Sequence, residues 1–196
     1  MLLHLFDLIG TFAFGLAGAF RGVRLGLDLL GVLLLAAVTG TGGGIVRDLV
    51  IGERPYAFLS YEPLSICLAA GMMAFLAYRW FAKGWPVIFW ADAVGLGVFA
   101  ATGAAKAIEA DFTVFGVIFC GTVTAVGGGV IRDVLTNEVP AIMRTGFYAT
   151  SAIIASGTMA ATREPLIAAA VGTTVRWLSN RYNVQLPKRQ QPDLPE

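Results

Sequence analysis

The segment Gly42-Gly43-Gly44-Ile45-Val46-Arg47-Asp48 recurs as Gly127-Gly128-Gly129-Val130-Ile131-Arg132-Asp133, at a spacing of 85 residues. The repeat extends from residues 7–55 to residues 92–140, and 16 of the 49 pairs aligned without a gap are identical. The identical pairs include Asp7/Asp92, Gly10/Gly95, Phe14/Phe99, Gly18/Gly103, Thr39/Thr124, Glu53/Glu138 and Pro55/Pro140. The chain therefore contains two copies of one unit, and such a repeat in a hydrophobic chain points towards transport.

The composition predicts that the chain is solvated by a lipid bilayer. Of 196 residues, 57% are apolar and only 14% are charged, and the mean hydropathy is +0.73. This leaves too little polar surface to cover a water-soluble globule. The start, Met1-Leu2-Leu3-His4, lacks the basic region of a signal peptide, so we expect the first apolar run to be a retained span. The sequence predicts an integral membrane protein.

Composition also argues against two other classes. The net charge is +1 and the basic residues are scattered between apolar runs, which gives no reason to expect nucleic acid as a partner. Cys67 and Cys120 lie in different apolar runs. A thiol there behaves as a small hydrophobe, so we expect neither a disulfide nor a redox role.

Seven apolar runs are candidates for membrane spans, since a helix needs roughly 20 residues to cross the hydrocarbon core. They cover residues 3–20, 29–51, 62–81, 87–105, 113–136, 145–162 and 165–181. The seventh opens with Glu164-Pro165 but carries Arg176 one turn from its end. It is therefore either a short span with a snorkelling arginine or an interfacial helix.

The basic residues predict the orientation of these spans. With the N-terminus outside, the outer segments hold only Arg54, Lys106 and Arg163, whereas the cytoplasmic segments hold nine basic residues, namely Arg21, Arg24, Arg79, Lys83, Arg144, Arg176, Arg181, Lys188 and Arg189. The positive-inside rule then places the C-terminus in the cytoplasm. Because each repeat contributes three spans, the second repeat must be inverted relative to the first. The sequence predicts an all-α membrane protein with a single transmembrane domain, residues 1–182. This domain contains inverted three-helix repeats at about 3–81 and 87–162 and a seventh helix at about 165–181. A disordered cytoplasmic tail is predicted at 183–196.

The two glycine triplets, Gly42 to Gly44 and Gly127 to Gly129, lie about halfway along the second and fifth predicted spans. Three consecutive glycines cost a helix on the order of 2–3 kcal/mol relative to alanine, so we expect a break or kink at each triplet. Unwound backbone at this depth is tolerated mainly where it lines a cavity. We therefore expect the triplets to cross near the midplane beside a polar path. The alternative is that these glycines only let two helices approach closely.

An arginine and an aspartate follow each triplet inside the apolar runs, as Arg47-Asp48 and Arg132-Asp133. A charged side chain inside a span costs several kcal/mol and usually lies in a bundle interior or a wet cavity. We interpret these pairs as gate residues. The alternative is that the arginine of one repeat pairs with the aspartate of the other and locks the bundle, and one ion pair can serve both purposes.

Four further polar residues and one lysine are candidates for the same path. Thr39 and Thr124 lie one turn upstream of the triplets, where their hydroxyls would line one stripe with the glycine carbonyls. Asp7 and Asp92 lie near the starts of the first and fourth spans and either attract cations into two vestibules or complement the helix N-termini. Lys106 breaks the cytoplasmic bias of the basic residues, so it is either a snorkelling anchor or a gating charge.

Enzyme signatures are missing from the sequence. The glycine-rich segment Gly40-Thr41-Gly42-Gly43-Gly44 lacks the Gly-Lys-Ser/Thr ending of a phosphate loop and lies in a transmembrane run. His4 is the only histidine, and no cluster of Cys, His or acidic residues has metal-ligand spacing. We expect no catalysis, no metal and no cofactor.

The doubled Gly-Gly-Gly-x-x-Arg-Asp segment, with Asp7-Leu8-Ile9-Gly10 and Asp92-Ala93-Val94-Gly95 in the equivalent first helices, resembles the bacterial trimeric intracellular cation (TRIC) channels. The resemblance covers roughly residues 3–182. It implies a multi-pass protein of the cell inner membrane, assembled as a homotrimer with one pore per subunit. Potassium would be the main permeant ion, with sodium less favoured, and membrane lipid a further binding partner. In this family the pore follows the second and fifth helices, which are kinked at triplets that match Gly42–Gly44 and Gly127–Gly129 here. The Lys-Glu-Val segment of the vertebrate branch is not matched by Lys106-Ala107-Ile108.

Three functions remain open from the sequence. A cation channel needs weak coordination at several sites along a wet path, which carbonyls and hydroxyls can supply. A carrier for glycine or another small zwitterion would use the same broken helices to hold a carboxylate and an ammonium, and relatives of this domain have been labelled glycine transporters. A membrane scaffold would use its glycines for packing alone. The channel is the interpretation that the sequence favours.

Overall fold

The computed structural model describes residues 2–78, 85–144 and 147–186, and these form nine α-helices. They are α1 (Leu2–Arg24), α2 (Leu29–Ile51), α3 (Tyr56–Leu59), α4 (Glu62–Ala77), α5 (Trp85–Glu109), α6 (Val114–Leu135), α7 (Ala141–Arg144), α8 (Tyr148–Thr162) and α9 (Pro165–Arg181). The seven longer helices lie on the seven predicted runs with small shifts at their ends, whereas α3 and α7 were not predicted. Residues 79–81 and 145–146 of those runs, and residues 187–196 of the predicted tail, lie outside the described residues.

The element order repeats at the spacing of the sequence repeat. Helices α1 to α4 each have a counterpart about 85 residues further along in α5 to α8, including the short helices, which begin at Tyr56 and Ala141. Helix α9 follows the second copy and has no counterpart among the described helices. The duplication therefore reaches beyond the segment in which identical residues are frequent.

The two copies also begin their second helices in the same way. The side chain of Asp28 caps α2 by accepting a hydrogen bond from the Gly31 backbone nitrogen (2.7 Å), and Thr113 caps α6 by accepting one from Gly116 (3.3 Å). Each cap satisfies one of the free N–H groups at the start of its helix. Different residue types thus perform the same task at equivalent positions.

Each turn before or after these helices contains one residue with a left-handed backbone conformation. Gly26 (φ 75°) and Asp111 (φ 56°) lie before α2 and α6, and Gly52 (φ 87°) and Asn137 (φ 55°) follow them. Glycine adopts this conformation without strain, and Asp and Asn are among the side chains that tolerate it best. The turn geometry of the first copy is retained in the second although the glycines are not.

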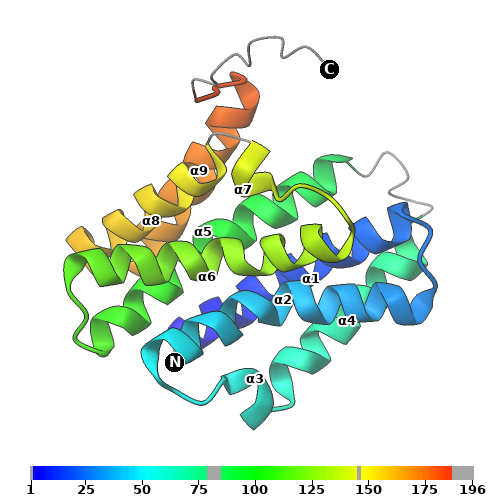
Figure 1. The fold of residues 1–196 in the computed structure, drawn as a ribbon, viewed down its shortest axis with the longest axis horizontal. Helices are drawn as coiled ribbons and strands as arrows, with labels where there is room; N and C mark the ends of the chain where they lie inside the picture. The colour runs from blue at the N-terminus through cyan, green and yellow to red at the C-terminus, as the bar shows by residue number, and fades with distance from the viewer. Residues whose placement is uncertain (1, 79–84, 145–146, 187–196) are drawn as a thin grey trace, which may run out of the picture.

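Helices α1, α2, α5 and α6 form the centre of the molecule (Figure 1). Helices α1 and α5 pack against each other and against their own second helices, and α2 packs against α6. Helix α4 packs on α1 and α2, while α8 packs on α5 and α6, and α9 packs on α5 and α8. Helices α4 and α8 therefore lie at the periphery. The charged segments of α2 and α6 lie in the central four-helix group.

Four described helices are long and apolar enough to cross a membrane, namely α1, α2, α6 and the Val87–Glu109 part of α5. Large apolar side chains at equivalent positions point outward from α2 and α6, such as Leu30 (75% exposed) and Phe115 (79% exposed). Lipid tails are the solvent that such a surface requires. Helices α4, α8 and α9 have 16, 15 and 17 residues, so the seven-span count stays a prediction.

The predicted break at the glycine triplets is wrong, while a kink at the triplets stays a prediction. Helix α2 continues as an α-helix through Gly42–Gly44 to Ile51, and α6 continues through Gly127–Gly129 to Leu135. The reason is tertiary packing, which overrides the low helix propensity of glycine. A Cβ atom at Gly43 would meet the backbone oxygen of Thr124, and one at Gly128 would meet that of Thr39.

The contact between α2 and α6 is therefore a close approach of two backbones. A Cβ atom at Gly127 would lie 3.2 Å from Gly43 Cα, and one at Gly42 would lie 3.5 Å from Gly128 Cα. Small residues permit such an approach in membrane bundles. In this conformation the triplets perform the packing role that the sequence left as the alternative.

Helices α2 and α6 run antiparallel across this contact. Gly43 faces Thr124, one turn before the second triplet, and Gly128 faces Thr39, one turn before the first. From Thr39 to Gly43 along α2, the facing residues of α6 therefore run backwards, from Gly128 to Thr124. The segments that follow the two triplets consequently leave the contact in opposite directions.

The first helices of the two copies, α1 and α5, contact each other through equivalent residues. The rings of Phe14 and Phe99 have centroids 5.3 Å apart, and both side chains are fully or almost fully buried. A Cβ atom at Gly10 would lie 2.5 Å from the Phe99 ring, and one at Gly95 would lie 2.9 Å from the Phe14 ring. Each ring thus occupies the space left by the glycine of the other copy.

Candidate functional site: two ion clusters at opposite ends of a helix crossing

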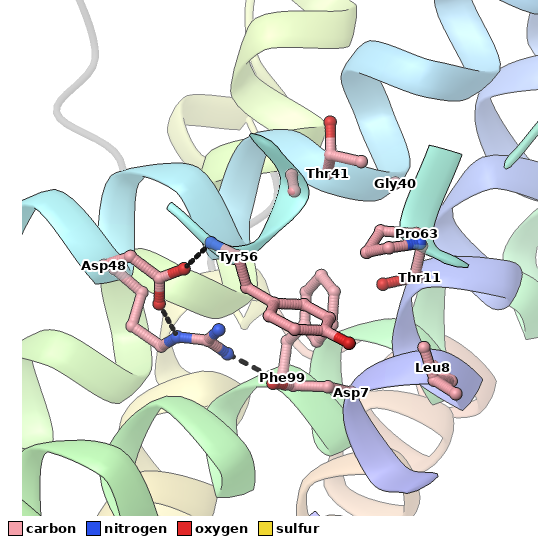
Figure 2. Close-up of a pocket in the computed structure, with 12 residues that line it drawn as sticks. Asp7, Leu8, Thr11, Gly40, Thr41, Asp48, Tyr56, Pro63 and Phe99 are labelled. Carbon is pink, nitrogen blue, oxygen red and sulfur yellow. Dashed lines mark hydrogen bonds and ion pairs between the residues drawn. The ribbon is translucent and has the colours of Figure 1, made fainter. Parts of the chain in front are cut away.

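The first cluster consists of Asp7 from α1 and Arg47 and Asp48 from α2. Arg47 Nη1 donates to Asp7 Oδ1 (2.8 Å) and Arg47 Nε donates to Asp48 Oδ1 (2.9 Å), as Figure 2 shows. The second oxygen of Asp48 accepts a hydrogen bond from the Tyr56 backbone nitrogen at the start of α3 (2.9 Å). Both charges of the Arg47-Asp48 pair are buried. A buried pair is stable only when its remaining donors and acceptors are satisfied in this way.

The second cluster, Asp92, Arg132 and Asp133, has the same hydrogen bonds at equivalent positions. Arg132 Nη1 donates to Asp92 Oδ1 (3.0 Å) and Arg132 Nε donates to Asp133 Oδ1 (2.9 Å). Asp133 Oδ2 accepts from the Ala141 backbone nitrogen at the start of α7 (2.9 Å). The Arg-Asp pair of each copy therefore ties the second helix to the first helix and to the short helix of the same copy.

The prediction that the arginine of one repeat pairs with the aspartate of the other, and so locks the bundle, is wrong. Arg47 and Arg132 each bind aspartates of their own copy, because the neighbouring aspartate and the first-helix aspartate already satisfy the guanidinium. Other ion pairs connect the copies. Lys106 Nζ of α5 lies 3.4 Å from Asp48 Oδ1, and Arg21 of α1 pairs with Glu138, which follows α6.

Lys106 and Arg21 occupy equivalent positions in α5 and α1, and each forms an ion pair with an acidic residue of the other copy. The two acids are not equivalent, since Asp48 lies within α2, whereas Glu138 corresponds to Glu53 in the segment after that helix. Lys106 points inward to Asp48 with 26% of its side chain exposed. Its interpretation as a snorkelling anchor is therefore wrong, while its interpretation as a gating charge stays a prediction.

Each cluster borders a cavity, and the two cavities differ in size. The first has a volume of about 30 Å³ and is lined by Asp7, Thr11, Thr41, Gly44, Arg47 and Asp48, among others (Figure 2). The second has a volume of about 330 Å³ and is lined by Arg21, Asp92, Arg132, Asp133, Arg144 and Arg176, among others. A cavity needs roughly 10–15 Å³ of such space to hold one water molecule. The first cavity therefore has room for about two or three water molecules, and the second has room for many waters or a small ligand.

Some candidate pore residues line a cavity, and others lie in packed contacts between helices. Gly44 lines the first cavity, whereas Gly43 and Gly128 lie in the contact between α2 and α6. The hydroxyls of Thr39 and Thr124 donate to backbone oxygens of their own helices (both 2.6 Å). These threonines are fully buried and line neither of the two cavities. A role for them in a pore would need another conformation and stays a prediction.

Asp7 and Asp92 line the first and second cavities respectively, and each pairs with the arginine of its own copy. They lie beyond the first turn of α1 and α5. Their interpretation as helix N-terminal charges is therefore wrong, and their role in vestibules stays a prediction. Outside the apolar spans, Tyr56 donates from its hydroxyl to Glu62 (2.6 Å), and this bond raises the pKa of Tyr56.

Several lining residues were missed by the sequence analysis. Thr11 and Thr41 line the first cavity, and Tyr148 and Arg176 line the second. The guanidinium carbon of Arg176 lies 4.9 Å from the Tyr148 ring centroid and 5.5 Å from that of Phe89. The sequence carried no signal for this contact, since the three residues belong to three different helices. Among the described residues, no group of three His, Cys, Asp or Glu side chains could hold a metal ion.

Solved structures that share this arrangement of helices include TRIC channels. A structure determined to explain conductance through TRIC cation channels is 36% identical, covers 99% of this chain and 100% of that one, and superposes with a TM-score of 0.85. A prokaryotic TRIC channel crystallised in 0.5 M KCl is 32% identical, covers 95% and 99%, and has a TM-score of 0.88. The fold and the doubled ion cluster thus define an all-helical membrane protein of the TRIC class.

Sequence comparison gives the family. Residues 4–79 and 89–164 match the family described as Glycine transporter, one match for each copy. A UPF0126 membrane protein of Deinococcus radiodurans is 41% identical over 201 residues, which cover 97% of this chain and 94% of that protein. The chain therefore belongs to this family of membrane proteins, and the resemblance to TRIC channels is confirmed.

Proposed function

We propose that this chain is a monovalent cation channel that prefers potassium. The observation that carries the proposal is the pair of equivalent Arg-Asp clusters, each beside a cavity, on either side of the close contact between α2 and α6. A path that joins the two cavities would pass this contact, and the carboxylates at both of its ends would become available to cations once their ion pairs rearrange. The similarity to TRIC cation channels at 36% identity supports this function.

The proposed pathway is closed in this conformation. The first cavity holds about 30 Å³, and the backbones of α2 and α6 touch at Gly43 and Gly128. Opening would separate the triplets and rearrange the ion pairs at each end. Arg47-Asp48 and Arg132-Asp133 are then gate residues as well as structural ones, because the same hydrogen bonds that hold the helices must change when the helices move.

The remaining features of the proposal follow the resemblance and the sequence. The protein would cross the cell inner membrane seven times as two inverted repeats plus α9, with the N-terminus outside and the C-terminus in the cytoplasm. Three copies would assemble as a homotrimer with one pore in each subunit. The first cavity would then face the outside and the second the cytoplasm.

One prediction tests the gating charge. Neutralising Lys106 in the Lys106→Gln variant is expected to raise cation flux several-fold. The ammonium lies 3.4 Å from Asp48 Oδ1, so its removal frees one acceptor of the first cluster and removes a charge that repels cations. The measurement is uptake of a rubidium tracer into liposomes that contain the purified protein.

The control for this prediction is Arg54→Gln, which removes one positive charge from an exposed residue of the segment between α2 and α3. Its flux should equal that of the unmodified protein. Flux in Lys106→Gln at or below the unmodified level, with the variant correctly folded, would show that Lys106 does not restrain conduction.

A second candidate function is a carrier for glycine or another small zwitterion. The unequal cavities favour it, since about 330 Å³ at one end and about 30 Å³ at the equivalent end is the arrangement of a transporter open to one side. The family description supports it as well. Saturable uptake of labelled glycine into liposomes, in the absence of tracer rubidium flux, would establish the carrier and exclude the channel.

A further inference from the structure

Three helices meet beside the first cavity in a contact that uses the only histidine of the chain. His4 Nε2 of α1 lies 3.2 Å from Glu62 Oε2 of α4. Tyr56 of α3 donates its hydroxyl to the same carboxylate oxygen (2.6 Å), and its ring lies edge to face with that of His4, with centroids 5.7 Å apart. We call these three residues the His4 latch. The latch joins the start of α1 to α3 and to the start of α4.

The latch is continuous with the first ion cluster and with the wall of the first cavity. The backbone nitrogen of Tyr56 donates to Asp48 Oδ2 (2.9 Å), and the Tyr56 side chain lines the cavity (Figure 2). Pro63, the neighbour of Glu62, lines it as well. Helix α3 and the start of α4 therefore form part of the cavity wall, and the latch holds this part against α1. Separation of α3 from α1 would enlarge the cavity.

The second copy has no such latch. At the spacing of 85 residues, the counterparts of the three residues are Phe89, Ala141 and Phe147, which carry neither a charge nor a hydroxyl. The cavity of the second copy has a volume of about 330 Å³, against about 30 Å³ for the cavity beside the latch. The polar contact thus belongs to the copy with the smaller cavity.

The strength of the latch depends on the charge of His4. The titratable and charged side chains that His4's own helix and the elements around it bring to this end of the molecule are Asp7 of α1, Arg47 and Asp48 of α2, Glu53 and Arg54 after α2, Tyr56 of α3, Glu62 of α4, and Lys106 and Glu109 of α5. Among them, Glu62 is the acid that His4 contacts, while Arg47 binds both aspartates. Histidine is the side chain that ordinarily changes its charge between pH 5 and 8. Since protonated His4 attracts the Glu62 carboxylate and neutral His4 does not, the latch tightens as the pH falls through this range.

We propose that the His4 latch is a pH-sensitive closure of the first cavity. Mild acid holds α3 and the start of α4 against α1, and neutral to alkaline conditions loosen them. The His4 and Glu62 side chains are 45% and 53% exposed, so protons from water reach the pair and water screens its attraction. An ion pair of this kind shifts an equilibrium by about two- to fivefold. The closure concerns access to the cavity and does not require that the chain conducts ions.

Access to a cysteine in the first cavity tests the latch. Thr11 is buried and lines this cavity, so Thr11→Cys places a thiol behind the latch. The measurement is the rate at which a small water-soluble methanethiosulfonate modifies the purified protein between pH 5.5 and 8, followed by intact mass. The unmodified protein, whose Cys67 and Cys120 are buried, gives the background. Because a thiol reacts as its thiolate, each rate is divided into that of the same cysteine variant with His4→Gln, which cancels the pH dependence of the thiol.

We expect the His4→Gln protein to react about two- to fivefold faster at pH 5.5 and at an equal rate at pH 8. Glu62→Gln should have the same effect, and the two changes together should add nothing further, as expected for one interacting pair. Glu164→Gln is the matched control, since it neutralises an exposed acid at the start of α9 that does not line the cavity. Ala57→Cys, also in the cavity wall, replaces Thr11→Cys if that variant does not fold. A ratio of one at every pH, a ratio that stays constant with pH, or the same ratio for Glu164→Gln would overturn the latch.

Discussion

The Gly43→Ala variant is expected to be clearly less stable than the unmodified protein, although only one methyl group is added. The new Cβ atom would meet the backbone oxygen of Thr124, and a backbone atom in a packed helix cannot move aside as the end of a flexible side chain can. Overpacking of this kind costs about 1–3 kcal/mol and sometimes more. The measurement is the midpoint of unfolding in mixed micelles with an increasing fraction of denaturing detergent.

Gly44→Ala is the matched control, because it makes the same change one residue further along the same helix. The nearest atom to a Cβ at this position is Arg47 Nη2, at an ordinary 3.7 Å. Alanine is favoured over glycine inside a helix by about 1 kcal/mol, so this variant should be as stable as the unmodified protein or more stable. Equal losses in both variants would contradict the close contact between α2 and α6.

The Arg132→Gln variant is expected to lose about 3–5 kcal/mol of stability, the cost of leaving buried charges without their partner. Arg132 is the partner of both Asp92 and Asp133, and all three side chains are buried. Without the guanidinium, two carboxylates lie close together with no cation between them. The same mixed-micelle titration measures the loss.

The control is the double variant Asp92→Asn with Arg132→Gln. Removing the Asp92 charge relieves one of the two uncompensated carboxylates, so the double variant should be more stable than Arg132→Gln alone. Residues in one hydrogen-bonded network show such non-additive effects. Strictly additive losses from Asp92→Asn and Arg132→Gln would mean that the pair does not interact as the second cluster shows.

Much of the fold follows from the sequence because a bilayer restricts which segments can form. The seven longer helices lie where apolar runs of sufficient length occur, and the capped starts at Leu29 and Val114 follow residues that are good N-caps. The short helices α3 and α7 were missed because four residues are too few to give a hydrophobic period. Their importance lies in backbone nitrogens, at Tyr56 and Ala141, which no sequence pattern reports.

The glycine triplets show where propensity misleads. The conformational cost of glycine predicted broken helices, but the gain from close packing between α2 and α6 exceeds that cost. The charged pairs were found because charges inside apolar runs are rare. Their partners were not, because Asp7 and Lys106 approach the first cluster from other helices and only the tertiary fold brings them together.

Single-channel recording of the purified protein in planar bilayers under a potassium gradient tests the proposed function most directly. The channel predicts unitary currents that reverse near the potassium equilibrium potential and disappear when potassium is replaced by a large organic cation. Silent bilayers, together with saturable glycine uptake by the same protein in liposomes, would contradict the channel and identify the chain as a carrier.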